Sequence, residues 1–120
     1  MKKILFIEDE NDLNTVYKKK FSSIYNIDFA TNSETALNKI ISWHPDLIIL
    51  DIFIPGKYNG IGVLKEIKSN LEISDIPVLV LTNLEGEEKT VLSLGAVACL
   101  IKSNVGFDVV AEKIEYILTH

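Results

Sequence analysis

Residues 47–51 read Leu-Ile-Ile-Leu-Asp, a run of four apolar residues that ends abruptly in an acid. A run that is apolar on both faces is typical of a strand buried in the middle of a parallel sheet. Three other apolar runs end at polar residues: 3–7 (KILFI) at Glu8 and Asp9, 78–81 (VLVL) at Thr82, and 97–101 (VACLI) at Lys102. The C-terminal ends of parallel strands lie along one edge of an open sheet, where ligands bind, so we expect these polar side chains and Asp51 to converge at one site.

Segments with apolar residues at helical spacing separate these runs, and an alternating segment at residues 27–30 predicts a fifth strand. The predicted helices cover residues 12–23, the segment from Asn32 to His44-Pro45, the segment around 61–67, and residues 85–94 and 107–118. Strands that alternate with helices require right-handed crossovers and helices on both faces of the sheet. The half-polar strand at 27–30 belongs at an edge. The pattern therefore predicts an α/β fold, a flavodoxin-like (βα)5 doubly wound parallel sheet with strand order 2-1-3-4-5.

Length and composition fit one domain over residues 1–120, with 48% hydrophobic and 24% charged residues. The net charge of -5 argues against nucleic acid or an anionic membrane as a direct partner. A single cysteine, Cys99, fits a reducing compartment, and the apolar runs are too short for a secretory signal or a membrane span. These features predict a cytoplasmic protein without a membrane partner.

The predicted site suits a metal ion and a phosphoryl group. Three carboxylates that converge must raise one another's pKa or bind a cation, and oxygen ligands completed by water suit Mg²⁺. A cation beside Lys102 makes a positive pocket for a dianionic phosphoryl group. Asp51 is the natural nucleophile in such a pocket, and the hydroxyl of Thr82 can donate to a phosphoryl oxygen.

These residues resemble the receiver domain of two-component response regulators, and the resemblance covers the whole chain. The family's acidic pair appears as Glu8-Asp9, its phosphoacceptor as Asp51 in LIILDIFIPG, its hydroxyl residue as Thr82 in LVLTN, and its lysine as Lys102 in CLIKS. The resemblance implies that Asp9, Asp51 and the backbone carbonyl of Phe53 contact Mg²⁺ directly, with Glu8 acting through water.

The resemblance also implies a function. A sensor histidine kinase or a phosphotransfer protein would donate a phosphoryl group to Asp51 in a Mg²⁺-dependent step. Thr82 and Lys102 would then move and reshape the face formed by the fourth helix, fifth strand and fifth helix, which a downstream effector protein would read. Such a chain is a signalling phosphoacceptor rather than an enzyme, since it catalyses only its own phosphorylation and dephosphorylation. The sequence contains no output domain, so either a partner protein carries the signal or the chain is one piece of a longer regulator.

Three features depart from the family pattern. Cys99 stands three residues before the lysine, where an aromatic residue is usual. Ser103 replaces the proline that usually follows the lysine through a cis peptide bond, and base rates favour a trans bond here. The loop 55–60 is about one residue longer than usual, and Asn83 replaces the common alanine after Thr82; its larger side chain is expected to slow the approach of water to an acyl phosphate.

Other functions remain open. The two substitutions at Cys99 and Ser103 leave room for a phosphorylation-independent pseudo-receiver that acts as a protein-binding adaptor. An aspartyl phosphohydrolase of the haloacid-dehalogenase type needs an acid two residues after its nucleophile, where this chain has Phe53. A flavin carrier of the same strand order needs a phosphate loop after the first strand, where residues 8–12 are mostly acidic and repel phosphate.

Overall fold

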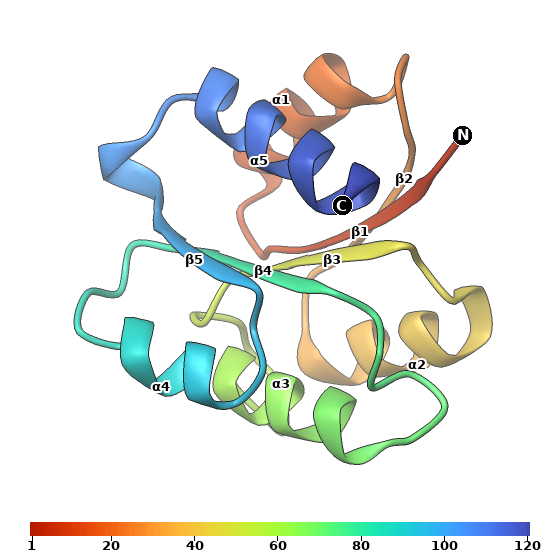
Figure 1. Ribbon diagram of the computed structural model, residues 1–120, viewed down its shortest axis with the longest axis vertical. Coiled ribbons are helices and arrows are strands. Elements are labelled where there is room, and N and C mark those ends of the chain that lie inside the picture. Colours follow the sequence, from red (N-terminus) through yellow and green to blue (C-terminus); the bar gives the residue numbers. More distant parts are fainter.

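The computed structural model describes residues 1–120 as one five-stranded parallel sheet with order β2-β1-β3-β4-β5 (Figure 1), which confirms the predicted topology. The strands are β1 (Lys3–Ile7), β2 (Asn26–Ala30), β3 (Leu47–Leu50), β4 (Val78–Thr82) and β5 (Ala98–Ile101). The helices are α1 (Asn11–Phe21), α2 (Ser33–Trp43), α3 (Gly60–Ser69), α4 (Glu88–Ser93) and α5 (Phe107–Thr119), with a 3₁₀ turn, η1 (Lys102–Asn104), after β5. None of the helices has the length and apolar content that a membrane-spanning segment requires.

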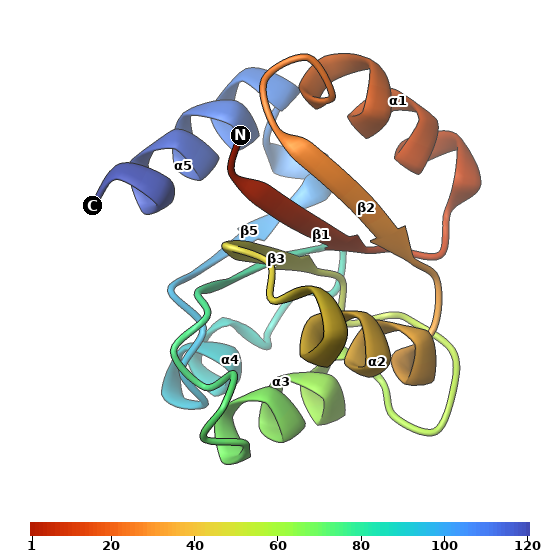
Figure 2. The ribbon, with the colours of Figure 1, turned by 90° about the vertical axis from the view of Figure 1, so that its right-hand side faces the viewer.

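The sheet separates two apolar cores. Helices α1 and α5 cover one face, and α2, α3 and α4 cover the other (Figure 1). The side chains of β1 and β3 alternate between the two cores: Leu5 and Ile48 face α2 and α3, and Phe6 and Ile49 face α1 and α5. The side chains of the central strands are therefore almost all apolar and buried. Strand β2 lies at the edge beside β1 (Figure 2), as its half-polar sequence predicts.

Strand register places Glu8 level with Asp51, and it places Thr82 and Lys102 one and two residues further along the same edge. Ile7, the last residue of β1, pairs with Leu50, the last residue of β3, and Thr82 pairs with Ile101 at the ends of β4 and β5. The amide of Asp51 donates to the carbonyl oxygen of Ile7 at 3.0 Å. The polar residues at the C-terminal ends of these strands therefore all lie at the same edge of the sheet.

The opposite edge of the sheet holds the N-terminal ends of the strands and the end of α2. The Lys3 ammonium donates to the carbonyl oxygen of Trp43 at 2.6 Å and lies 5.6 Å from the centre of its ring. His44 follows in the left-handed conformation with φ 51°, which ends the helix.

Several predicted boundaries differ from the structure by one to three residues. Helix α4 begins at Glu88 rather than at residue 85, because Gly86 adopts φ +86°, which is incompatible with a right-handed helix. Strand β5 begins at Ala98 and is half-buried along its length, so it forms the second edge of the sheet. All peptide bonds are trans, including the one between Lys102 and Ser103.

Candidate functional site

Three carboxylates meet at the C-terminal edge of β1 and β3. One oxygen each of Glu8, Asp9 and Asp51 lies within 4.8 Å of the others. Glu8 is 3% exposed and Asp51 6% exposed, whereas Asp9 faces solvent. Two of the three negative charges are thus withdrawn from water, which is costly unless a positive charge compensates them.

Lys102 supplies that positive charge from the far side of β4. Its ammonium donates to Asp51 Oδ2 at 2.8 Å and also to Glu8 Oε1. The Lys102 side chain is only 12% exposed, so both ion pairs are shielded from solvent. The structure therefore brings four of the predicted residues, Glu8, Asp9, Asp51 and Lys102, into one cluster.

Burial and pairing act in opposite directions on the cluster. Burial raises the pKa of Glu8, and the hydrogen bond and charge of Lys102 lower it only in part. Burial also lowers the pKa of Lys102, but hydrogen bonds to Asp51 and Glu8 and their charges outweigh it, so the net pKa is raised. Lys102 consequently stays charged at neutral pH, whereas its pairing with Glu8 does not fully offset the burial of that carboxylate.

The loop after β3 fixes the backbone around Asp51. The Phe53 amide donates to Asp51 Oδ1 at 3.2 Å, and the amide of Gly60, at the start of α3, donates to the Ile52 carbonyl at 2.8 Å. A Cβ atom at Gly60 would lie 2.3 Å from the Asp51 carbonyl oxygen. Glycine is therefore required for α3 to begin this close to the site.

The side chains of the other two predicted residues make no hydrogen bond to the cluster, although the backbone amide of Phe53 donates to Asp51. Thr82 is fully buried at the end of β4, and its hydroxyl oxygen accepts from the Leu84 amide at 3.2 Å. No hydrogen bond joins it to Asp51 or Lys102. Phe53 lies two residues beyond Asp51 with a 60% exposed side chain, and its role as a carbonyl ligand stays a prediction.

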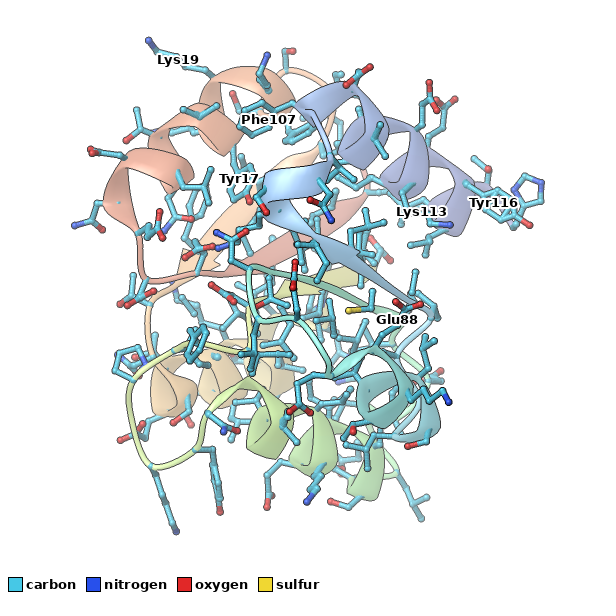
Figure 3. The ribbon with its side chains drawn as sticks, turned by 90° about the vertical axis from the view of Figure 1, so that its left-hand side faces the viewer. Tyr17, Lys19, Glu88, Phe107, Lys113 and Tyr116 are labelled. Carbon is cyan, nitrogen blue, oxygen red and sulfur yellow. The ribbon has the colours of Figure 1, made fainter.

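The sequence interpretation missed two residues of α1 that belong to the site. The Asn14 amide group donates to the carbonyl oxygen of Glu8 at 2.9 Å, within the protein interior. Tyr17 is 2% exposed and contacts Phe107 of α5 edge-on (Figure 3). Burial raises its pKa, and the charges of Glu8, Asp51 and Glu10 raise it further, so the phenol stays neutral. A signal for Asn14 existed, since it shares the apolar helical spacing of Tyr17 and Phe21.

A further contact links two residues that depart from the family pattern. The side-chain carbonyl of Asn83 accepts a hydrogen bond from the Ser103 amide at 2.9 Å. Proline has no amide hydrogen, so this bond requires a non-proline residue after Lys102. Each departure was visible in the sequence, but nothing in the sequence indicated that the two residues meet.

The cluster could hold a metal ion. It offers only oxygen ligands from three carboxylates, two of them buried, which suits a hard divalent cation that keeps part of its water shell. Lys102 contacts two members of this cluster, through Glu8 Oε1 and Asp51 Oδ2. A cation that binds either of these oxygens would share or displace the contacts of the ammonium.

Comparison with known proteins agrees with this geometry. The family model of the response regulator receiver domain matches residues 4–115. A probable transcriptional regulator, ycf27, of Cyanidium caldarium is 40% identical over 103 residues, which cover 82% of this chain and 39% of that protein. The chain thus spans about two fifths of the length of this relative.

Solved structures share the fold. The response regulator TrrA from Thermotoga maritima, solved in complex with Mg(2+)-BeF, is 34% identical, with a TM-score of 0.85 over 98% of this chain and 99% of that one. The receiver domain of RstA from Klebsiella pneumoniae has a TM-score of 0.88 at 23% identity, covering 98% of this chain and 99% of that one, which shows likeness of fold alone.

Proposed function

This chain belongs to the family of response regulator receiver domains, and from that premise we propose that it is a signalling phosphoacceptor whose Asp51 is phosphorylated in the presence of Mg²⁺. The donor is the phosphohistidine of a sensor histidine kinase or of a phosphotransfer protein. An Asp51 carboxylate oxygen forms the new bond to phosphorus while the bond from phosphorus to the imidazole nitrogen breaks, and the imidazole keeps the electron pair and takes up a proton.

The observation that supports this function most strongly is the position of Lys102 between Asp51 and Glu8. The transferred group carries charge on its peripheral oxygens, and catalysis depends on fixed positive charge beside the nucleophile. An ammonium that already contacts the nucleophilic carboxylate lies within reach of a phosphoryl group attached there. Thr82 ends β4 at the same edge of the sheet, and its hydroxyl, which accepts from the Leu84 amide, keeps its hydrogen free to donate to that group.

The acidic cluster would hold Mg²⁺ through Asp9, Asp51 and the Phe53 carbonyl, with Glu8 acting through water. When bound, the cation supplies charge neutralisation between Asp51 and the incoming phosphoryl group. The complex of TrrA with Mg(2+)-BeF supports a Mg²⁺ site here, because that protein covers nearly this whole chain at 34% identity.

The signal would leave through the face formed by α4, β5 and α5. Val97 and Tyr116 are exposed apolar side chains next to and on these elements, and Figure 3 shows Glu88, Lys113 and Tyr116 at this face. Cys99 is half-buried against the core of α2, α3 and α4. Because it is a cysteine, this position has no aromatic ring that could rotate outward. We therefore expect the change at this face to come from the segments that follow Thr82 and Lys102.

The test is phosphorylation by acetyl phosphate, read as intact mass with Mg²⁺ or with EDTA. We expect an adduct of one phosphoryl group in the wild type with Mg²⁺ and none in Asp51→Asn. The matched control is Asp12→Asn, an exposed carboxylate on α1, which should accept the group normally. A wild type that stays unmodified where TrrA is modified would contradict the proposal and favour the phosphorylation-independent adaptor.

A further inference from the structure

The hydrogen bond between Asn83 and Ser103 lies just beyond the ends of β4 and β5. The ladder between these strands ends with the pair Thr82 and Ile101. Asn83 follows Thr82 and Ser103 follows Ile101 after one residue, which is Lys102. The bond from the Ser103 amide to Asn83 Oδ1, at 2.9 Å, therefore continues the connection between the strands by means of a side chain. Lys102 is enclosed between the last ladder pair and this bond.

Few other contacts fix the backbone after Lys102. The chain leaves the sheet at once in the short turn η1, whose closing bond from the Val105 amide to the Lys102 carbonyl is 3.5 Å long. The side chain of Ser103 makes no hydrogen bond, and the residue is exposed. Apart from the ion pairs of Lys102 itself, the solvent-exposed bond to Asn83 is therefore the main hydrogen bond that restrains the backbone at Ser103.

The position of this segment matters because Lys102 reaches a long way. Strand β5 lies two strands from β3, a separation of about 10 Å, and β1 is one strand further. The ammonium nevertheless contacts both Asp51 and Glu8. A four-carbon side chain that spans this distance must be nearly extended. We therefore expect a small shift of its backbone to break both ion pairs.

We infer that Asn83 is a positioning residue for Lys102, whose side-chain carbonyl holds the Ser103 amide so that the ammonium stays on the carboxylates. This role has opposite effects on Mg²⁺ affinity, which it lowers, and on the rate of phosphorylation, which it raises. With the ammonium held in place, Lys102 competes with a divalent cation for Glu8 and Asp51. The same restraint keeps the ammonium available to the phosphoryl group, and this second consequence rests on the proposed function.

The experiment separates the acceptor of Asn83 from its bulk. Asn83→Leu keeps the size of the side chain and removes the acceptor, Asn83→Asp keeps the acceptor, and Ser103→Ala keeps the backbone amide as a matched control. Three quantities are measured in each protein: hydrogen exchange at the amide of residue 103 by NMR, Mg²⁺ affinity by calorimetry, and the rate of phosphorylation by acetyl phosphate at saturating Mg²⁺.

In Asn83→Leu we expect faster exchange at Ser103, Mg²⁺ affinity raised about threefold to tenfold, and phosphorylation slowed by a similar factor, the scale of one hydrogen bond. Asn83→Asp should restore both the amide protection and the rate, and Ser103→Ala should match the wild type. General structural damage would weaken Mg²⁺ binding and slow phosphorylation together, so that result would overturn the inference, as would wild-type behaviour of Asn83→Leu.

A double-mutant cycle with Lys102→Met tests whether Asn83 acts through Lys102. Without the ammonium, Asn83→Leu should no longer change Mg²⁺ affinity. An unchanged effect in that background would contradict the inference. If the wild type binds Mg²⁺ and shows the expected exchange pattern but accepts no phosphoryl group, the proposed function fails and the positioning role of Asn83 stands.

Discussion

The ammonium of Lys102 donates to two buried carboxylates at once, and it has no substitute within the cluster. Removing one member of a buried ion pair leaves the other charge without compensation, which costs far more than losing a surface pair. At the scale of single residues, the stability of the metal-free protein should therefore depend on this one side chain.

We expect Lys102→Met to lower the free energy of unfolding in EDTA by about 2–4 kcal/mol at pH 7, since Glu8 and Asp51 then remain buried without a counter-charge. Added Mg²⁺ should recover much of the loss. Urea unfolding with EDTA and with Mg²⁺ measures both effects, and Lys89→Met, at an exposed lysine of α4, is the control. An equal loss in the two variants would show that Lys102 has no special role.

The phenol of Tyr17 gives a prediction about alkaline pH. Its pKa is raised above the usual value in the folded protein, so the folded state holds the proton longer than the unfolded chain does. The stability that this provides is fully present below about pH 10 and is lost as pH rises toward the folded pKa, by at most about 1.4 kcal/mol per pH unit.

Tyr17→Phe should remove this part of the pH dependence. Between pH 8 and pH 11 the wild type should lose about 1 kcal/mol more unfolding free energy than the variant, because the variant has no phenol to ionise. Urea midpoints at the two pH values measure the difference, and Tyr116→Phe, at an exposed phenol, is the control. Parallel curves for wild type and Tyr17→Phe would contradict the assignment.

At the scale of elements, the connection from β3 to α3 fixes the nucleophile, and Gly60 is its closest approach. We expect Gly60→Ala to lower the free energy of unfolding by about 1–3 kcal/mol, since the new methyl group overlaps the backbone at Asp51 and Ile52. Mg²⁺ affinity should fall as well, because the shift moves Asp51. Gly106→Ala is the control, since the nearest atom there belongs to the flexible side chain of Asp108. Similar losses in the two variants would argue against a tight approach at Gly60.

The elements also show how far the sequence alone could predict this molecule. The polarity of residues 27–30, beside apolar runs such as 47–50, placed that strand at an edge, because a strand's burial is set by its place in the sheet. Together with the alternation of strands and helices, this was enough to predict the strand order. The predicted start of α4 was wrong, because the positive φ of Gly86 interrupts the helix and the spacing of apolar residues does not reveal it. The double contact of Lys102 and the bond between Asn83 and Ser103 depend on side-chain reach across strands, which periodicity does not encode.

At the scale of the whole molecule, a cation bound at the acidic cluster joins residues that follow different strands, so its binding should stabilise the complete fold. Mg²⁺ at ten times its dissociation constant should add about 1.4 kcal/mol to the free energy of unfolding, which corresponds to a rise in Tm of about 4–6 °C for a domain of this size. Scanning calorimetry measures the shift, and Asp9→Asn, which alters an exposed carboxylate that we propose as a ligand, should lose most of it. An equal shift in that variant would place the cation elsewhere.

The position of Trp43 has a practical consequence. This is the chain's only indole, and it lies with Lys3 at the N-terminal edge of the sheet, a strand length of about 16 Å from the carboxylates. Its fluorescence should change when α2 and β1 unfold. It should not change when a cation or phosphoryl group binds at the opposite edge of the sheet. The protein thus carries a built-in optical probe of folding that leaves ligand binding to be followed by separate means.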